Sequence, residues 1–301
     1  MNKLNIIYHP EYDIPVPPSH RFVGTKFSDL FNYLQSQDYF SNCKITQPQA
    51  ASKERLMRTH STNYIKKIIN EDLNDDELKK INLPWSRRLR DRSLLAIEGT
   101  YQAARLSLEN GIACHVGGGT HHAHHKYGFG FCIFNDLAYT AINLIEEGYV
   151  KSVLILDVDV HQGDGTIDIC QKYSSIYTCS IHSESNFPFE KKKGWMDISI
   201  PAGSSDNFYL SQINRVLENI ENCISPDIVL YDAGIDVFKD DKLGNLQITR
   251  GGIIQRDELI IQHFQRKSVP IVTVIGGGYS NDTNELASRH GIIFDVSAKM
   301  I

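Results

Sequence analysis

The sequence predicts an α/β protein, a single-domain three-layer α/β/α structure around a central, mostly parallel β-sheet. Short apolar segments rich in β-branched residues alternate along the chain with segments of helical periodicity. No linker rich in Pro, Gly or Ser and no internal repeat divides the chain. We therefore expect one domain over residues 1–301.

Four segments are predicted to be buried strands because they are short, apolar and bounded by turn residues, namely residues 112–116, 152–160, 227–231 and 270–275. The main helical patterns cover residues 92–110, 136–147, 207–222 and 250–266. This alternation favours parallel pairing, because a parallel connection needs a crossover segment that packs on the sheet. Ligands of open parallel sheets bind beyond the carboxyl ends of the strands, so the residues that follow each strand are the candidates for function.

Composition argues against several classes of protein. The formal net charge is −5, so the chain lacks the basic excess of a nucleic-acid-binding surface, and we expect no direct nucleic-acid partner. The six cysteines are scattered without a C-x-x-C pair, which indicates reduced thiols. Residues 4–8 are strand-like and too short for a signal peptide core, and no apolar run has bilayer length. We expect no membrane association and a cytoplasmic protein, or a nuclear one if the source is eukaryotic.

Histidine, aspartate and tyrosine side chains follow the four predicted strands. His121 and His122 follow the first, Asp157, Asp159 and His161 close the second, and Asp236 and Tyr279 follow the third and the fourth. Because side chains alternate along a strand, Asp157, Asp159 and His161 should share one face. Carboxylate and imidazole suit Zn²⁺, and a catalytic zinc takes three protein ligands and leaves a position for water. Asp236 is the natural third ligand, and without a cation such a set of buried groups would stay unpaired.

A zinc ion held by two carboxylates and one neutral imidazole acidifies water weakly, so the site needs a general base. His121 and His122 are the candidates, and Asp157 and Asp164 could each orient one of them through its distal N–H. The neighbouring His124 and His125 are expected to be exposed and inert. The phenol of Tyr279 can donate a hydrogen bond to the oxyanion that forms when water attacks a carbonyl group.

Together these residues resemble the histone deacetylase family, in particular its class IV and related bacterial members. The matching motifs occur in family order and lie at residues 20–22 (HRF), 118–123 (GGTHHA), 130–136 (GFCIFND), 157–165, 186–189 (NFPF), 232–236 (DAGID) and 277–280 (GGYS). They span residues 8 to 280, which is most of the chain. Several such motifs together are highly specific.

The resemblance implies the arginase/deacetylase fold and zinc-dependent hydrolysis of an acylated amine. By motif position it implies Asp159, His161 and Asp236 as zinc ligands, His121 and His122 as the acid/base pair, and Tyr279 as the group that polarises the carbonyl. It also implies a narrow tunnel lined by Gly130, Phe131 and Phe187 around an acyl-lysine stem, with Arg21 near the inner pocket for the acyl group or released acetate.

The family also carries a structural monovalent cation, usually K⁺. Its implied ligands are Asp157 through side chain and backbone, the backbone of Asp159, His161 and Ile181, and Ser180. Two positions depart from family patterns: Gln162 stands where class I enzymes have histidine, as is usual for class IV, and Asp164 stands where class IV commonly has asparagine. How His121 and His122 share the proton work therefore stays open.

Three alternatives to a protein acyl-lysine deacylase remain. The substrate could be a small acylated amine such as an acetylpolyamine. An arginase-like enzyme would need extra ligands for a second Mn²⁺ ion, about 3.5–4 Å from the first. A catalytically inactive acyl-lysine binding module would be marked by the loss of Tyr279 or of a metal ligand, and all of these residues are present. The sequence leaves acyl length, oligomeric state and the choice of Zn²⁺ or Fe²⁺ open.

Overall fold

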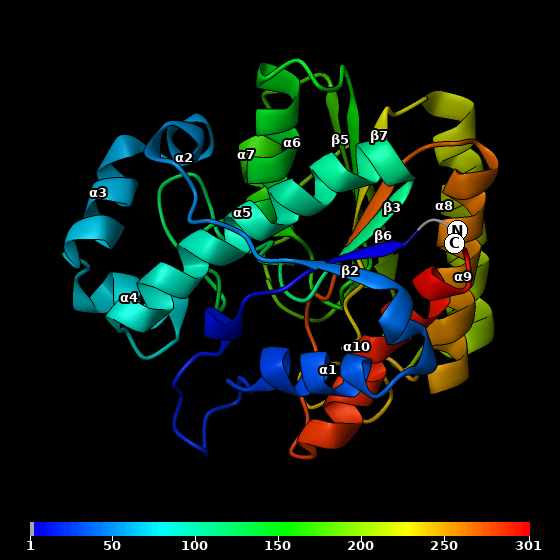
Figure 1. The fold of residues 1–301 in the computed structure, drawn as a ribbon, viewed down its shortest axis with the longest axis horizontal. Coiled ribbons are helices and arrows are strands. Elements are labelled where there is room, and N and C mark those ends of the chain that lie inside the picture. Colours follow the sequence, from blue (N-terminus) through cyan, green and yellow to red (C-terminus); the bar gives the residue numbers. More distant parts are fainter. Residues whose placement is uncertain (1–2) are drawn as a thin grey trace.

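The computed structural model describes residues 3–301 and contains an eight-stranded sheet in which all neighbouring strands are parallel (Figure 1). The strands are β1 (Leu4–Ile7), β2 (Cys43–Thr46), β3 (Ile112–His115), β4 (Val153–Asp157), β5 (Ile176–Ser183), β6 (Met196–Ile200), β7 (Ile228–Asp232) and β8 (Ile271–Val274). Their order across the sheet is β2-β1-β3-β8-β7-β4-β5-β6. The predicted parallel α/β architecture is confirmed.

Ten α-helices surround the sheet within the described residues (Figure 1). They are α1 (Lys26–Gln35), α2 (Lys53–Thr59), α3 (Thr62–Asn70), α4 (Asp75–Ile81), α5 (Arg87–Asn110), α6 (Asp136–Glu146), α7 (Asp164–Cys170), α8 (Asp206–Cys223), α9 (Arg250–Arg266) and α10 (Thr283–Ala298). Helices α5, α6 and α7 form one packed layer, and α1, α8, α9 and α10 form another. The sheet lies between these two layers, as the fold class requires.

Four central strands place their carboxyl ends in one row. The register pairs Asp157 of β4 with Ser180 of β5 on one side and with Asp232 of β7 on the other, and it pairs Asp232 with Val274 of β8. The segments that follow these strands therefore leave the sheet side by side. This row is the edge where a ligand site is expected.

The predicted strand at residues 152–160 ends earlier than expected, at Asp157. Beyond it, Oδ1 of Asp157 accepts a hydrogen bond from the backbone N–H of Asp159 at 3.1 Å, and Oδ1 of Asp159 accepts one from that of His161 at 2.9 Å. Such side-chain bonds to the backbone compete with the strand ladder. The prediction that strand alternation aligns these three side chains was therefore wrong. The chain turns after Asp157, so that Asp157 joins His121 and Asp232, while Asp159 and His161 join Asp236.

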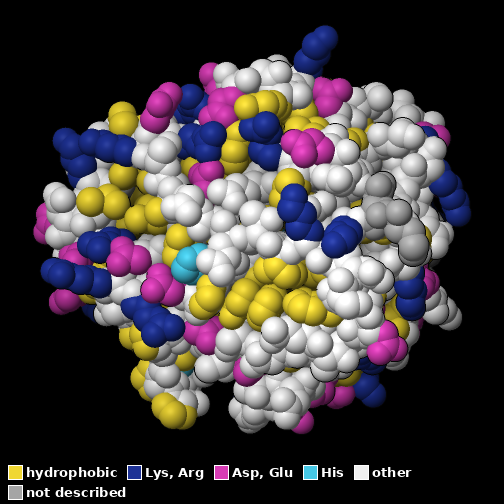
Figure 2. Space-filling model, viewed as in Figure 1, with side chains coloured by type: hydrophobic (Ala, Val, Ile, Leu, Met, Phe, Trp, Pro, Cys, Tyr) yellow, Lys and Arg dark blue, Asp and Glu magenta, His cyan; other side chains and the backbone are white. Residues whose placement is uncertain are grey.

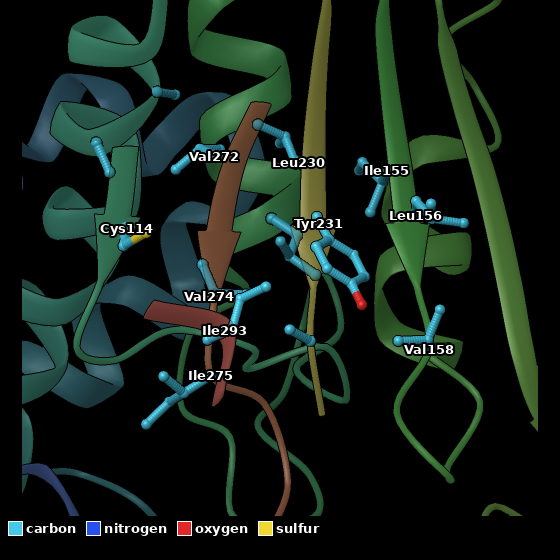
Figure 3. Close-up of a cluster of buried hydrophobic side chains, with 14 of the residues drawn as sticks. Cys114, Ile155, Leu156, Val158, Leu230, Tyr231, Val272, Val274, Ile275 and Ile293 are labelled. Carbon is cyan, nitrogen blue, oxygen red and sulfur yellow. The ribbon is translucent and has the colours of Figure 1, made fainter. Parts of the chain in front are cut away.

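The core below this edge is apolar and completely buried. Figure 3 shows side chains from the three middle strands packed beside one another, including Ile155 and Leu156 of β4, Leu230 and Tyr231 of β7, and Val272 and Val274 of β8. Burial of apolar surface contributes roughly 25 cal/mol per Å². The polar carboxyl ends of the strands therefore lie directly next to a tightly packed apolar core.

The surface carries charges of both signs. On the face shown in Figure 2, Lys and Arg side chains lie among Asp and Glu side chains, and no large part of that face is basic alone. Among the described residues, no helix combines the length and the apolar composition that crossing a bilayer requires.

Candidate active site and metal centre

A cavity of about 350 Å³ opens above the carboxyl ends of the central strands. Its lining includes His121, His122, Asp159, His161, Phe187 and Tyr279. Each of these residues comes from a segment that follows a strand, so the topology gathers side chains from distant parts of the chain. The sequence-predicted residues therefore meet in one place.

Asp159, His161 and Asp236 form a buried cluster whose potential ligand atoms all lie within 4.8 Å of one another. Nδ1 of His161 lies 2.9 Å from Oδ1 of Asp159 and 3.1 Å from Oδ2 of Asp236. Burial alone would lower the pKa of His161, but the hydrogen bonds and charges of the two carboxylates raise it to about 10. Burial and the charge of Asp159 raise the pKa of Asp236 to about 7.

These residues fit a divalent cation. One oxygen of each carboxylate is held by the backbone, because Asp159 Oδ2 accepts from the N–H of Gly277 at 2.6 Å and Asp236 Oδ1 accepts from that of Val160 at 2.8 Å. The other oxygens face Nδ1 of His161, which lies 3.1 Å from Asp236 Oδ2 without forming a well-aligned hydrogen bond to it. Buried carboxylates without partners are costly, and a cation would satisfy them. Two carboxylates and one imidazole are a donor set that suits Zn²⁺ or Fe²⁺.

Glycine is required beside this cluster. A Cβ atom on Gly277 would lie 2.1 Å from Oδ2 of Asp236 and 2.5 Å from Oδ2 of Asp159. Any larger residue would displace both carboxylates, so the glycine-rich segment lets the backbone approach the candidate metal ligands.

His121 and His122 each donate a hydrogen bond to a carboxylate. Nδ1 of His121 lies 2.7 Å from Oδ2 of Asp157, and Nδ1 of His122 lies 2.6 Å from Oδ1 of Asp164. In both rings Nε2 is then the nitrogen left for chemistry. The structure thus brings together the two His–Asp pairs that the sequence suggested.

The two imidazoles differ in charge. Burial and the neighbouring charge of His121 lower the pKa of His122 to about 4, although Asp164 opposes the shift. Burial would also lower the pKa of His121, but the charges of Asp157 and Asp159 outweigh burial and raise it well above its usual range. At neutral pH His122 is therefore neutral, whereas the surrounding carboxylates favour the protonated form of His121.

His124 is buried, so the expectation that it is exposed was wrong. Its Nε2 lies 3.1 Å from Oδ2 of Asp164, and its Nδ1 lies 3.0 Å from Oδ2 of Asp168. Helix α7 supplies both aspartates, four residues apart on one face, and this helical spacing creates the pocket for the ring. His125 is partly buried and bonds the carbonyl oxygen of Thr59 at 2.7 Å.

Tyr279 lies in the segment after β8. Its ring is buried and lines the cavity, and its backbone N–H donates to Oδ2 of Asp241 at 2.7 Å. Burial, reinforced by the charges of Asp236 and Asp159, raises the pKa of the Tyr279 phenol well above its usual range. The phenol therefore keeps its proton and can act as a hydrogen-bond donor.

The predicted tunnel residues also line the cavity. Gly130 and Phe131 both have left-handed backbone conformations, with φ values of 52° and 69°. Such a conformation is uncommon for a bulky residue, and hydrogen bonds from both N–H groups to the end of α4 hold it. The ring of Phe187 lies edge-on to His122 at 4.9 Å and packs against Phe129 at 5.0 Å. Phe129 was not singled out from the sequence.

The basic side chains of the cavity differ in burial. Arg21 lines the cavity but is exposed, whereas Lys26 and Arg92 line it and are buried. Lys26 begins α1 and Arg92 lies in the first turns of α5, and sequence analysis missed both. The sequence of an amphipathic helix does not distinguish a lysine or arginine that becomes buried from one that stays exposed.

The implied potassium ligands cluster behind the site. Asp157 and Ser180 are paired in register on β4 and β5, and Ile181 follows directly. The hydroxyl of Ser180 is 3.0 Å from Nδ1 of His182. A second group with metal-ligand spacing consists of His121, Asp157 and Asp232, and neither carboxylate oxygen of Asp232 has a partner among the described residues.

A parallel α/β sheet with paired histidines and a carboxylate–imidazole cluster at its carboxyl edge is the arrangement of the arginase/deacetylase fold. The sequence matches the histone deacetylase domain over residues 20–292. The chain therefore belongs to the histone deacetylase family. Membership of this family supports hydrolase activity and implies a metal cofactor.

Relatives cover most of the chain. It is 38% identical over 288 residues to an uncharacterized protein of Picosynechococcus sp., with 96% of each chain covered. It is 28% identical to histone deacetylase 2 of Arabidopsis thaliana, covering 97% of this chain and 81% of the relative. Identity to the acetoin utilization protein AcuC of Staphylococcus aureus is 30%, over 76% of this chain and 64% of the relative.

The fold also matches a solved structure. A crystal structure described as an HDAC homolog complexed with SAHA superposes with a TM-score of 0.80 at 23% sequence identity, covering 98% of this chain and 84% of that chain. This likeness supports the arginase/deacetylase fold.

Proposed function

We propose that the chain hydrolyses the amide bond of an acylated amine, with N-ε-acyl-lysine on a protein as the favoured substrate. The observation that carries the proposal is the buried Asp159–His161–Asp236 cluster at a cavity that also holds two His–Asp pairs and a tyrosine. The substrate protein, a histone or another, and the small acylated amines stay open. The names of the relatives support a deacetylase.

Asp159, His161 and Asp236 would hold one Zn²⁺ or Fe²⁺ ion. Bound there, the ion would polarise the substrate carbonyl and lower the pKa of water. The residues of the chain do the proton work. Neutral His122 accepts a proton from water while the water oxygen bonds to the acyl carbon. Protonated His121 then donates a proton to the amine nitrogen while the C–N bond breaks. The products are a carboxylate and a free amine.

Tyr279 donates its phenolic proton in a hydrogen bond to the oxyanion that forms in this step. Phe131 and Phe187 hold the aliphatic stem of the acylated amine and keep water away from the reacting bond. A potassium ion held by Asp157, Ser180 and the backbone of Asp159, His161 and Ile181 would stiffen the segment that carries the metal ligands.

A binuclear hydrolase is the second candidate, because His121, Asp157 and Asp232 form a second group with metal-ligand spacing. The hydrogen bond of 2.7 Å between His121 and Asp157 favours the mononuclear enzyme, since both groups are already paired with each other. The number of transition-metal ions per chain separates the two candidates. One ion per chain supports the deacylase, and two support the binuclear enzyme.

The test uses purified protein, an acetyl-lysine peptide and acetylpolyamines, with release of free amine as the readout. We expect turnover that stops on treatment with a chelator and returns with Zn²⁺ or Fe²⁺. Binding without turnover in metal-loaded protein would instead identify an inactive binding module. Full activity in metal-free protein would overturn the proposed function.

A further inference from the structure

Two cations from distant parts of the chain line the active-site cavity and lie against the same ring, that of Phe27, at 5.3 and 4.7 Å from its centre. Lys26 at the start of α1 and Arg92 in α5 both line the cavity, and each is only 5% exposed. Charged side chains are rarely buried to this degree without an ionic partner. Their environment therefore indicates what the cavity binds.

Neither cation has a carboxylate within 4.0 Å among residues 3–301. Lys26 donates to the carbonyl oxygen of Gly276 at 3.0 Å and lies 5.1 and 5.3 Å from the ring centres of Phe22 and Phe27. Arg92 donates through Nε to the carbonyl oxygen of Tyr12 at 3.0 Å. Its Nη2 is buried and has no hydrogen-bond partner among the described residues.

No acid among residues 3–301 forms an ion pair with either cation. The charges of Asp13 and Asp136 act on Arg92 from beyond 4.0 Å, and both oxygens of Asp136 accept hydrogen bonds from Thr100, Gly119 and Thr120 instead.

Under the proposed function, the charges of Asp159 and Asp236 are balanced by the divalent ion that they hold. Burial and the charge of Asp157 raise the pKa of Asp232 well above its usual range, which disfavours its charged form. Burial and the charge of Arg92 lower the pKa of Lys26 to about 8, which leaves it mostly protonated at that pH.

We propose that Lys26 and Arg92 bind the terminal carboxylate of a dicarboxylic acyl group, so that the enzyme removes succinyl-type groups from lysine. This inference rests on the proposed function and names its substrate class. An ammonium and an arginine fork are suited to a carboxylate, and a buried ion pair needs both partners. A long hydrocarbon chain in the same space would leave both cations buried and unpaired.

The reaction is ordinary hydrolysis. Water adds to the acyl carbon, the C–N bond breaks, and a proton reaches the lysine nitrogen, so succinyl-lysine and water give succinate and lysine. No oxidant or further reactant is needed.

The experiment compares kcat/KM of the metal-loaded protein for one lysine peptide that carries a succinyl, succinamoyl, acetyl or octanoyl group. Succinamoyl has nearly the shape of succinyl without its charge. We expect succinyl to exceed succinamoyl by about 10- to 100-fold, the usual range for a hydrogen bond to a charged group. Equal rates for the two, or a preference for octanoyl, would overturn the inference.

Two substitutions assign the preference to these side chains. Lys26→Met and Arg92→Met keep the aliphatic stems, and each should reduce the succinyl preference by about tenfold or more while the acetyl rate changes less. Lys26→Arg keeps the charge and should retain the preference, and Lys151→Met on the surface is the matched control. An equal fall with acetyl and succinyl peptides would mean that the cations only assist release of any carboxylate product, which contradicts the inference. If the unsubstituted protein hydrolyses none of the peptides, including the acetyl peptide, the proposed function itself fails.

Discussion

Asp164 holds His122 in place through a hydrogen bond of 2.6 Å between its Oδ1 and Nδ1 of the imidazole. Its second oxygen contacts His124, so one carboxylate organises two buried rings. Burial would raise the pKa of Asp164, but the hydrogen bonds from both histidines hold it well below its usual range. The carboxylate is therefore ionised at any working pH and fixes the tautomer of His122.

The first prediction concerns this carboxylate. Asp164→Asn removes the charge that supports protonation of His122 and should lower kcat by about 10- to 100-fold, as loss of a supporting residue commonly does. Metal content should be unchanged, because Asp164 is not in the Asp159–His161–Asp236 cluster. The pH profile of kcat should change as well. An unaltered rate and profile would show that His122 does not need Asp164.

The second prediction separates His124 from its neighbour. His124→Gln removes the ring between Asp164 and Asp168 and should lower kcat by less than about tenfold, because Asp164 keeps its bond to His122. His125→Gln is the matched control, since among residues 3–301 the His125 ring forms its hydrogen bond to the backbone carbonyl oxygen of Thr59 and to no carboxylate. Steady-state kinetics of both variants, with melting temperatures, test this. Equal effects of the two substitutions would contradict a special role for His124.

The third prediction concerns the metal. Asp159→Ala, His161→Ala and Asp236→Ala should each abolish deacylation and reduce bound Zn²⁺ or Fe²⁺ from about one ion per chain, because a catalytic zinc site needs all three protein ligands. Elemental analysis and activity of the same preparations provide the measurement. Retention of a full complement of metal in all three variants would place the ion elsewhere.

The fourth prediction concerns the oxyanion. Tyr279→Phe should lower kcat by about 10²–10³, the usual cost of losing one oxyanion donor, and should leave the fold and the metal content intact. KM should change less than kcat, since the hydrogen bond strengthens only as charge develops on the oxygen. A normal turnover rate would mean that Tyr279 has a packing role alone.

The fifth prediction concerns stability and pH. Burial would raise the pKa of Glu147, but hydrogen bonds from Arg55 and Tyr101 lower it from 4.5 to about 2. Because the folded-state pKa is depressed, the stabilisation is complete above pH 4.5 and is lost as the pH falls toward 2. Glu147→Gln should therefore lower the free energy of unfolding most at pH 7, with the deficit shrinking by pH 3.

Urea unfolding of the wild type and the variant at both pH values measures this difference. Glu54→Gln is the control, because Glu54 pairs with Arg58 on the surface with 81% of its side chain exposed, and such pairs contribute little. If Glu147→Gln lowers the free energy of unfolding equally at both pH values, the packing of Glu147 and not its charge stabilises the fold.

Sequence patterns were sufficient for the fold class and for the residues around the candidate metal. Buried parallel strands are continuous apolar runs, and their carboxyl ends are marked by abrupt changes to glycine, histidine and aspartate, so the site could be located along the chain. The edge strands β2 and β6, and the strand β5 beside β6, were missed because their apolar and polar residues are mixed. One domain over residues 1–301 stays a prediction.

Only the tertiary structure determines the contacts between segments that are far apart in the sequence. Lys26 and Gly276 are 250 positions apart, and His124 is buried only because α7 folds back over it, so neither environment leaves a local pattern. Side-chain charge and spacing determine which chemistry a segment can perform. Burial and proximity set the pKa values and leave Lys26 and Arg92 without an ion-pair partner among the described residues. Both arise only when the packed sheet and helices exclude water from these side chains.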